Sequence, residues 1–268
     1  MPADDMAPAA AIHASLRAAK RELRKQIRES LKSVSADSQA EQSSIATKAL
    51  FALPAYQAAQ NVAVYLAMPT GEIQTTEIVR DAFKKGKNVY VPSLHKLERP
   101  NVRGRKSIME MLALDSITDY ESLKADRWGI PSVDPESVPR RRNCLGGHGI
   151  LSEREAQADV SESREKDEPL IGLDLIVVPG MAFDRSLRRL GHGAGYYDDF
   201  LTKYLSTMSE LNEKKGGPPA KRPYLAALAL KEQILPQDEG IPVEEHDYLV
   251  DAVFVGDGSV IDASISAN

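Results

Sequence analysis

Cysteine is almost absent from this chain of 268 residues, in which Cys144 is the only one. A single cysteine excludes an internal disulfide framework and any metal site built from several cysteines. It also suits a reducing compartment. Because Cys144 lies in a glycine-rich stretch without a motif around it, we expect an inert thiol.

Long apolar runs are missing too, because charges interrupt every hydrophobic stretch before the roughly 18 to 20 residues that span a bilayer. The sequence therefore predicts a soluble protein with no membrane partner. The first 19 residues lack a secretory hydrophobic segment, and Asp4 and Asp5 argue against a transit peptide. We therefore expect a cytoplasmic rather than a mitochondrial protein.

Neither sign of charge dominates, since 34 basic and 39 acidic residues give a net charge of -5 and a pI near 5.7. This balance argues against a nucleic-acid partner, which a broadly basic surface would attract. An anionic ligand must therefore meet a local basic cluster. With 42% hydrophobic and 27% charged residues, the chain can bury a sizeable core.

Helical and strand patterns alternate along the chain. Apolar residues at helical spacing predict an amphipathic helix over about 12–34, and a second helix follows over about 38–51. Nearly continuous apolar runs predict buried strands, with helical crossovers at about 75–85 and 196–206. The predicted fold class is α/β, a layered, mostly parallel sheet flanked by helices in a Rossmann-like, three-layer arrangement. The predicted strands are 62–66, 89–91, 109–114, 173–178, 224–230 and 252–255.

Three stretches are predicted to be surface insertions: 96–106, 140–169 and 211–222. The middle one begins with three arginines, contains a Gly-Gly pair and ends in a charge-dense run, so we expect a long exposed or disordered loop. The rest of the chain is expected to form a single domain with an ordered core over about 12–258.

The most informative passage is DLIVVPGMAFDRSLRRLGHGAGYYDDFL, residues 174–201. A buried strand leads to Gly191, Gly193 and Gly195, which alternate just before a helical pattern that opens at Tyr196. Alternate glycines let the backbone approach a ligand and turn successive N–H groups inward, and the helix N-terminus adds positive dipole. This arrangement is typical of a phosphate cradle.

Charged residues flank these glycines. Arg188 and Arg189 are candidate phosphate partners, and Asp198 and Asp199 are candidate magnesium ligands. A glycine-rich turn packed tightly for steric reasons is the alternative, because the spacing matches neither the dinucleotide-binding pattern nor the P-loop.

Residues 179–184 and 189–198 resemble the motif of the 5-formyltetrahydrofolate cyclo-ligase family, PGLAFD followed by RLGxGxGYYD. The resemblance implies that the second segment forms an ATP loop and that Asp198 binds Mg²⁺. The implied nucleotide contacts are Arg189, Leu190, Gly191, His192, Gly193, Ala194, Gly195, Tyr196 and Tyr197, of which 192–196 would also border the folate. Arg189 and Tyr196 are candidate catalytic residues.

This chain departs from the family motif at three positions. Leu187 stands where the family has a glycine, and it predicts a different backbone path at the entry turn. His192 and Ala194 stand where many relatives carry other polar residues or glycine. The ligand contacts implied for these two residues are therefore the least secure.

The N-terminal helix supplies a second signal. At 100° per residue, Lys20 falls between Ile27 and Leu31 in the apolar stripe, with Arg24 on its flank. Burying an ammonium is costly unless it meets an anion, although a lysine at the edge of the stripe could also snorkel to water. The segment resembles the family's N-terminal K-x-x-x-R, which implies that Lys20, a third catalytic candidate, and Arg24 contact ATP phosphates.

In VYLAMPTGEIQT, residues 64–75, a strand ends in a Pro/Gly loop and a helix begins. Strand C-terminal ends are where open α/β sheets bind ligands. A similar family motif implies that Leu66 and Glu72 contact the folate. The alternative is that Glu72 stabilises the N-terminus of the following helix.

Two further residues are singled out by the same resemblance. Trp128, in the segment WGIP, is a candidate stacking wall for the folate rings, or else a core tryptophan. Asp247 lies in a closing segment that resembles the family's, which implies a second magnesium ligand. A solvated loop carboxylate is the alternative.

The resemblance implies conversion of 5-formyltetrahydrofolate, ATP and Mg²⁺ to 5,10-methenyltetrahydrofolate, ADP and phosphate. The formyl oxygen would attack the γ-phosphate, and N10 would then close the ring. The partner would be a small-molecule folate, with or without a polyglutamate tail, and we expect a monomer. The alternatives are a non-catalytic ATP- or folate-binding protein on the same scaffold, and a sugar-phosphate isomerase or acyl-transfer enzyme of similar fold.

Overall fold

The computed structural model describes residues 6–97, 100, 106–149, 172–214, 221–244 and 247–263. A seven-stranded sheet forms its centre. In spatial order its strands are β11 (Val260–Asp262), β10 (Ala252–Val255), β9 (Tyr224–Ala229), β6 (Leu175–Val178), β1 (Asn61–Val64), β2 (Asn88–Lys96) and β3 (Ser107–Leu114). The five inner strands run parallel, whereas β11 and β3 pair antiparallel at the two edges. All six predicted strands are confirmed.

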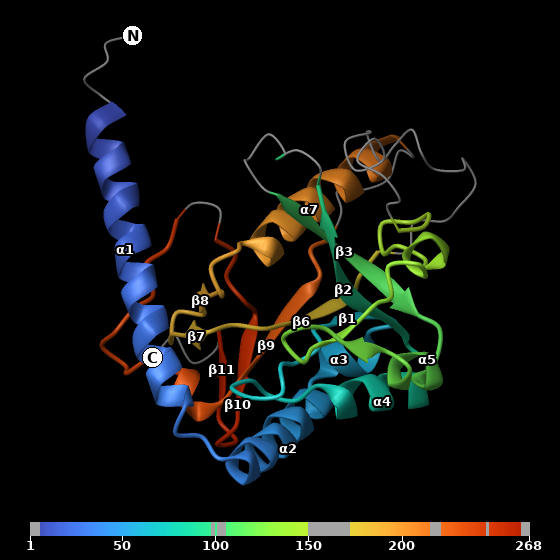
Figure 1. Ribbon diagram of the computed structural model, residues 1–268, viewed down its shortest axis with the longest axis horizontal. Helices are drawn as coiled ribbons and strands as arrows, with labels where there is room; N and C mark the ends of the chain where they lie inside the picture. The colour runs from blue at the N-terminus through green and yellow to red at the C-terminus, as the bar shows by residue number, and fades with distance from the viewer. Residues whose placement is uncertain are drawn as a thin grey trace.

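Helices cover both faces of the sheet, which confirms the three-layer prediction (Figure 1). Helix α7 (Tyr196–Lys214) lies over one face, and α2 (Ala36–Ala52), α3 (Pro54–Ala58) and α4 (Thr76–Lys84) lie over the other. Each inner strand contributes side chains to the hydrophobic cores on both faces of the sheet, because successive side chains point to opposite faces. No described helix is long and apolar enough to cross a membrane.

Strand β6 illustrates this division of the core. Leu175 and Val177 pack on the side of α2 and α4, while Ile176 and Val178 pack on the side of α7. All four are almost completely buried. The unbroken apolar run is therefore the pattern expected of a strand covered on both faces.

Helix α1 (Met6–Leu31) lies beside the sheet rather than on one of its faces (Figure 1). It packs through Leu23, Ile27 and Leu31 against a third, smaller cluster that includes Met181 and Leu190. It begins six residues before the predicted start and ends at Leu31, three before the predicted end. The chain then turns, and the Ser35 side chain caps α2.

Short elements complete the fold around the strand C-terminal ends. One hairpin joins β7 (Ala182–Phe183) to β8 (Arg189–Leu190), and another joins β4 (Lys124–Ala125) to β5 (Pro131–Ser132). Helix α5 (Ile117–Glu121) and the 3-10 turns η2 (Val138–Arg140) and η3 (Lys231–Gln233) lie between longer elements. None of these was predicted.

The expectation of an exposed loop is wrong for the first part of the 140–169 insertion. Arg141, Asn143, Cys144 and Leu145 are buried, and the Cys144 amide donates to the Met111 carbonyl of β3 at 3.0 Å. These residues cover the edge of the sheet, where unpaired backbone groups need partners. Residues 150–169, most of the expected insertion at 96–106, and residues 215–220 of the one at 211–222 lie outside the described residues. Residues 211–214 of the last stretch belong to α7, so the expectation of an insertion is wrong for them.

Candidate active site

The glycine loop follows the β7–β8 hairpin, in which Ala182 pairs with Leu190 and fixes where the loop begins. Gly193 and Gly195 have φ values of 109° and 70°, a left-handed region that favours glycine. A Cβ at Gly193 would lie 3.5 Å from the Arg24 guanidinium carbon, and Arg24 Nε donates to the Gly191 carbonyl at 2.7 Å. The loop therefore lies directly against α1.

At the turn before this loop, Leu187 adopts a backbone conformation that is typical of glycine. Leu187 has a φ of 63°, in the left-handed region that favours glycine and that leucine rarely adopts. The different path expected at this turn stays a prediction. Asp184 supports the turn, because its buried carboxylate accepts from the Arg188 amide at 3.0 Å and the Ile241 amide at 2.9 Å. Arg188, a candidate phosphate partner, lies 3.8 Å from the same carboxylate.

Arg189 and Asp198 form a two-point ion pair. Arg189 Nη2 lies 2.9 Å from each oxygen of Asp198, and the guanidinium stacks 5.7 Å from the centre of the Tyr197 ring. Both charged side chains are largely buried, with 6% and 15% of their area exposed. The backbone amide of Tyr248 also donates to Asp198, at 3.3 Å.

Lys20 meets two carboxylates. Its Nζ lies 2.6 Å from Asp247 Oδ2 and 3.0 Å from Glu244 Oε2, and only 8% of the residue is exposed. The predicted burial of Lys20 against an anion is confirmed, and the snorkelling alternative is wrong. Burial lowers the pKa of the nearby Arg24 guanidinium, while the Asp247 carboxylate acts in the opposite direction.

The two tyrosines at the start of α7 differ in their surroundings. The Tyr196 hydroxyl makes a hydrogen bond with the Ser107 hydroxyl at the start of β3. The Tyr197 hydroxyl is buried without a hydrogen-bond partner among the described residues, and burial raises the pKa of this phenol. A buried hydroxyl that lacks a partner is costly, so a ligand oxygen or nitrogen beside Tyr197 would be favourable.

Glu72 turns into the site rather than towards the helix after it. Its Oε2 accepts from the Met68 amide at 2.9 Å, and its Oε1 lies 3.1 Å from His192 Nε2 of the glycine loop. The acidic residue in the first turn of α4 is Glu77. The helix-stabilising alternative for Glu72 is therefore wrong, and Leu66, before it on the same loop, is buried.

Trp128 lies at the tip of the β4–β5 hairpin with 62% of its area exposed, so the core-tryptophan alternative is wrong. The adjacent Gly129 approaches Pro69 so closely that an added Cβ would lie 2.6 Å from that ring. The Arg127 guanidinium stacks on the indole at 5.0 Å. The tip thus places an exposed aromatic ring beside the 65–72 loop.

The two candidate magnesium ligands, Asp198 and Asp247, lie in the same site, and each forms an ion pair with a basic side chain. Asp198 accepts a hydrogen bond from the amide of Tyr248, the residue after Asp247, so the backbone that carries Asp247 lies beside Asp198. Within the described residues there is no group of three or more histidine, cysteine or acidic side chains arranged to hold a metal. Two carboxylates still fit Mg²⁺, which is commonly bound by one or two carboxylates with phosphate and water oxygens.

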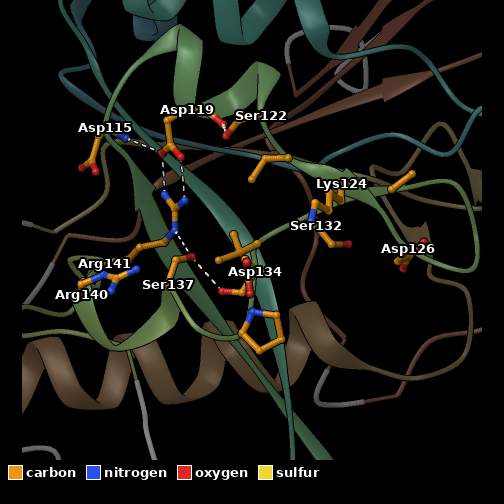
Figure 2. Close-up of a pocket in the computed structure, with 14 residues that line it drawn as sticks. Asp115, Asp119, Ser122, Lys124, Asp126, Ser132, Asp134, Ser137, Arg140 and Arg141 are labelled. Atoms are coloured by element: carbon orange, nitrogen blue, oxygen red, sulfur yellow. Dashed lines mark hydrogen bonds and ion pairs between the residues drawn. The ribbon is translucent and has the colours of Figure 1, made fainter.

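A separate pocket of about 620 Å³ lies at the base of the β4–β5 hairpin (Figure 2). Two of its acids have structural partners: Asp119 forms a two-point pair with Arg141, and Asp126 accepts from the Trp128 and Ile130 amides. The pocket is lined by Asp115, Asp119, Ser122, Leu123, Lys124, Ala125, Asp126, Ser132, Val133, Asp134, Pro135, Ser137, Arg140 and Arg141. None of the predicted site residues is among them.

The structure brings together nearly all the predicted residues, and it adds two that were missed. Glu244 is a direct partner of Lys20, and Ser107 is a partner of Tyr196. No sequence signal separates Glu244 from the adjacent Glu245, which lies outside the described residues. Ser107 belongs to the part of the β2–β3 hairpin where the apolar pattern is weakest.

Residues 16–256 match the model of the 5-formyltetrahydrofolate cyclo-ligase family. A 5-formyltetrahydrofolate cyclo-ligase from Mus musculus is 31% identical over 243 residues, which cover 91% of this chain and 96% of that protein. A second, from Saccharomyces cerevisiae, is 31% identical over 245 residues, covering 91% and 98% respectively.

The fold is also shared with a solved structure. The NMR structure of Aquifex aeolicus 5,10-methenyltetrahydrofolate synthetase has a TM-score of 0.52 at 21% identity and covers 91% of this chain and 92% of that one. Identity this low supports a common fold and no finer likeness. The family match itself spans Lys20, the glycine loop and Asp247. The chain therefore belongs to the 5-formyltetrahydrofolate cyclo-ligase family.

Proposed function

We propose that the protein converts 5-formyltetrahydrofolate to 5,10-methenyltetrahydrofolate in a reaction that consumes ATP and releases ADP and phosphate. The observation that carries this proposal is the convergence of Lys20 and Arg24 of α1 with Arg189 and the glycine loop, which are more than 160 positions away in sequence. The names of the curated relatives support the same reaction.

The nucleotide phosphates are proposed to lie beside the contact between α1 and the glycine loop. Lys20, Arg24 and Arg189 would contact the phosphates, and backbone amides of 190–195 would contribute donors at the α7 N-terminus. The Leu190 side chain is buried in the third cluster, so only its backbone is available. Gly193 lies close enough to Arg24 that both would reach the same phosphate group.

The folate is proposed to lie between the 65–72 loop and the tip that carries Trp128. Glu72 is a suitable acceptor for pterin N–H groups, because its buried carboxylate is already held by the Met68 amide. Trp128 offers an exposed ring for stacking. His192 contacts Glu72 and so would join the folate side of the site to the glycine loop. Leu66, Ala194 and Tyr196 complete the proposed contacts.

The proposed chemistry needs alignment and charge neutralisation rather than a covalent nucleophile. The formyl oxygen attacks the γ-phosphorus, and ADP leaves as the P–O bond to it breaks. Folate N10 then bonds to the activated carbon and gives up its proton, and phosphate departs with the former formyl oxygen and takes up that proton. Lys20 and Arg189 would neutralise charge on the transferred group, and Tyr196 would position it.

Mg²⁺ is proposed to be held by Asp198 and Asp247 with phosphate oxygens. The ion would neutralise phosphate charge during transfer. Both carboxylates are ion-paired in the structure, so their cations must be released to the phosphates as the metal is bound. The protein is further proposed to act as a cytosolic monomer, which agrees with its single, buried cysteine.

Near-ultraviolet absorbance tests the proposed function, because 5,10-methenyltetrahydrofolate absorbs there and the formyl substrate does not. The protein is mixed with 5-formyltetrahydrofolate and Mg²⁺, with and without ATP. Absorbance is expected to rise only when ATP is present. Binding of both ligands without any rise would instead identify a non-catalytic binding protein on the same scaffold.

A further inference from the structure

We propose that Glu244 is an internal counter-ion that holds Lys20 while the nucleotide site is empty, competes with ATP for it, and so lowers nucleotide affinity. This inference rests on the proposed function, because it takes Lys20 to be a phosphate contact. Glu244 lies in the closing segment whose resemblance to the family singles out Asp247, but that resemblance gives Glu244 no role. It is assigned a role by its contacts alone.

The contact geometry leaves little room for a phosphate at Lys20. Its Nζ lies 3.0 Å from Glu244 Oε2 and 2.6 Å from Asp247 Oδ2. The exposed fractions of the three side chains are 10%, 12% and 17% for Lys20, Glu244 and Asp247. An ammonium has three donors, and these two carboxylates use two of them. A phosphate group that accepts from more than the one remaining donor must therefore displace a carboxylate.

A charge count distinguishes Glu244 from the other acids. Among the described residues, three carboxylates lie beside the cations Lys20, Arg24 and Arg189; they belong to Glu244, Asp247 and Asp198. Mg²⁺ would neutralise Asp198 and Asp247 when the nucleotide is bound. Glu244 is the remaining carboxylate, and it would then repel the phosphates for which Lys20 is needed.

Glu244 also has a second partner on α1 to which it can turn. Its Oε1 lies 3.2 Å from His13 Nδ1, whose side chain is 55% exposed. His13 and Lys20 are seven residues apart, about two helical turns, and so lie on the same face of α1. Release of Lys20 to a phosphate therefore does not require Glu244 to leave α1.

A hydrogen bond within the connection between β9 and β10 orients the carboxylate of Asp247 relative to Glu244. The Glu244 amide donates to Asp247 Oδ2 at 2.8 Å, so the backbone of one acid orients the side chain of the other. Removing the charge of Glu244 should therefore leave Asp247 correctly placed. This separation makes Glu244 testable apart from the proposed metal ligands.

The test compares Glu244→Gln with Glu239→Gln, an exposed glutamate on the same connection. Calorimetric titration with ATP and with ADP, each with Mg²⁺ and without folate, measures Kd directly. Glu244→Gln is expected to lower Kd about three- to tenfold, the range of one partly exposed ion pair, and Glu239→Gln is expected to leave it unchanged. The ligand-free Tm of Glu244→Gln should fall, because Lys20 loses a partner.

An unchanged or higher Kd for Glu244→Gln would overturn the inference, and normal turnover of the wild type would then leave the proposed function standing. If the wild type neither binds nucleotide nor forms product, both fail together. If Glu244→Gln does not fold, the Kd of Glu244→Asp for the same nucleotides, measured by the same titration, tests the inference. Its carboxylate is one methylene shorter and is expected to lower Kd by a smaller factor.

Discussion

The Lys20 ammonium lies 2.6 Å from an Asp247 carboxylate oxygen, although 227 positions separate the two residues in sequence. This contact fastens α1 to the connection between β9 and β10. Lys20, a proposed phosphate contact, and Asp247, a proposed magnesium ligand, thus form an ion pair with each other in the structure. Arg189 and Asp198 repeat the arrangement within the same site.

Lys20→Met is expected to lower kcat/KM for ATP about 10- to 150-fold, because one charge-assisted hydrogen bond to a phosphate is worth about 1.5–3 kcal/mol. Removing the ammonium also leaves the Glu244 and Asp247 carboxylates without their shared cation. We therefore expect a loss of about 1–3 kcal/mol in unfolding free energy as well, because buried acceptors are left unsatisfied. Urea titrations and ATP kinetics measure the two effects separately.

Arg21→Met is the matched control, since Arg21 is exposed on the same helix. It should change both quantities much less. Normal ATP kinetics for a folded Lys20→Met protein would remove α1 from the nucleotide site.

Trp128→Ala is expected to leave Tm nearly unchanged, because the ring is 62% exposed and its loss opens no cavity. The KM for folate should rise about three- to tenfold through the loss of stacking. Trp128 is the only tryptophan, so folate binding should also quench the intrinsic fluorescence of the wild type. Unaltered folate KM and unquenched emission would place Trp128 outside the site.

The sheet could be predicted because short, nearly continuous apolar runs mark strands that are buried on both faces. Strand β2 was predicted over 89–91 but extends to Lys96, since Pro92 and the polar residues after it interrupt the run. The β7–β8 and β4–β5 hairpins have two-residue strands, which are too short to have a period. Their positions depend on tertiary contacts such as the one between Gly129 and Pro69.

The site could be predicted only as far as local patterns reach. A helical wheel places Lys20 on the buried face of α1, but it contains no information about which anion lies opposite. The glycine spacing and the family resemblance located Gly193 and Arg189, yet not the contact between Arg24 and the Gly191 carbonyl. Glu244 has no periodic signal, so its role required the fold.

Deleting residues 152–168 with a short Gly/Ser bridge is expected to leave activity largely intact, because this charge-dense stretch matches no motif of the site. A deletion that begins at Asn143 should instead lower the unfolding free energy by about 3 kcal/mol or more. It removes the Asn143 bond to Glu110 at 2.8 Å and the buried Leu145. Chemical denaturation of both variants checks the difference, and equal stability would contradict the packing described for this segment.

Asp119 is expected to make stability depend on pH in the acidic range (Figure 2). Its hydrogen bonds to Arg141 hold the carboxyl pKa below the ordinary value of 3.8. The resulting stabilisation is fully present above pH 3.8 and is lost as pH falls through the lower pKa of the folded state. The wild type should have a higher urea midpoint than Asp119→Asn at pH 6, and this difference should be smaller at pH 3. An equal difference at the two pH values would contradict the prediction.

The most direct measurement of the central claim is the nucleotide product formed per folate converted. Purified protein is incubated with 5-formyltetrahydrofolate and MgATP, methenyltetrahydrofolate is followed by absorbance, and nucleotides are separated by chromatography. Transfer of the γ-phosphate predicts one ADP for each methenyltetrahydrofolate and no AMP. Stoichiometric AMP and pyrophosphate, or methenyltetrahydrofolate formed without any nucleotide consumed, would contradict it.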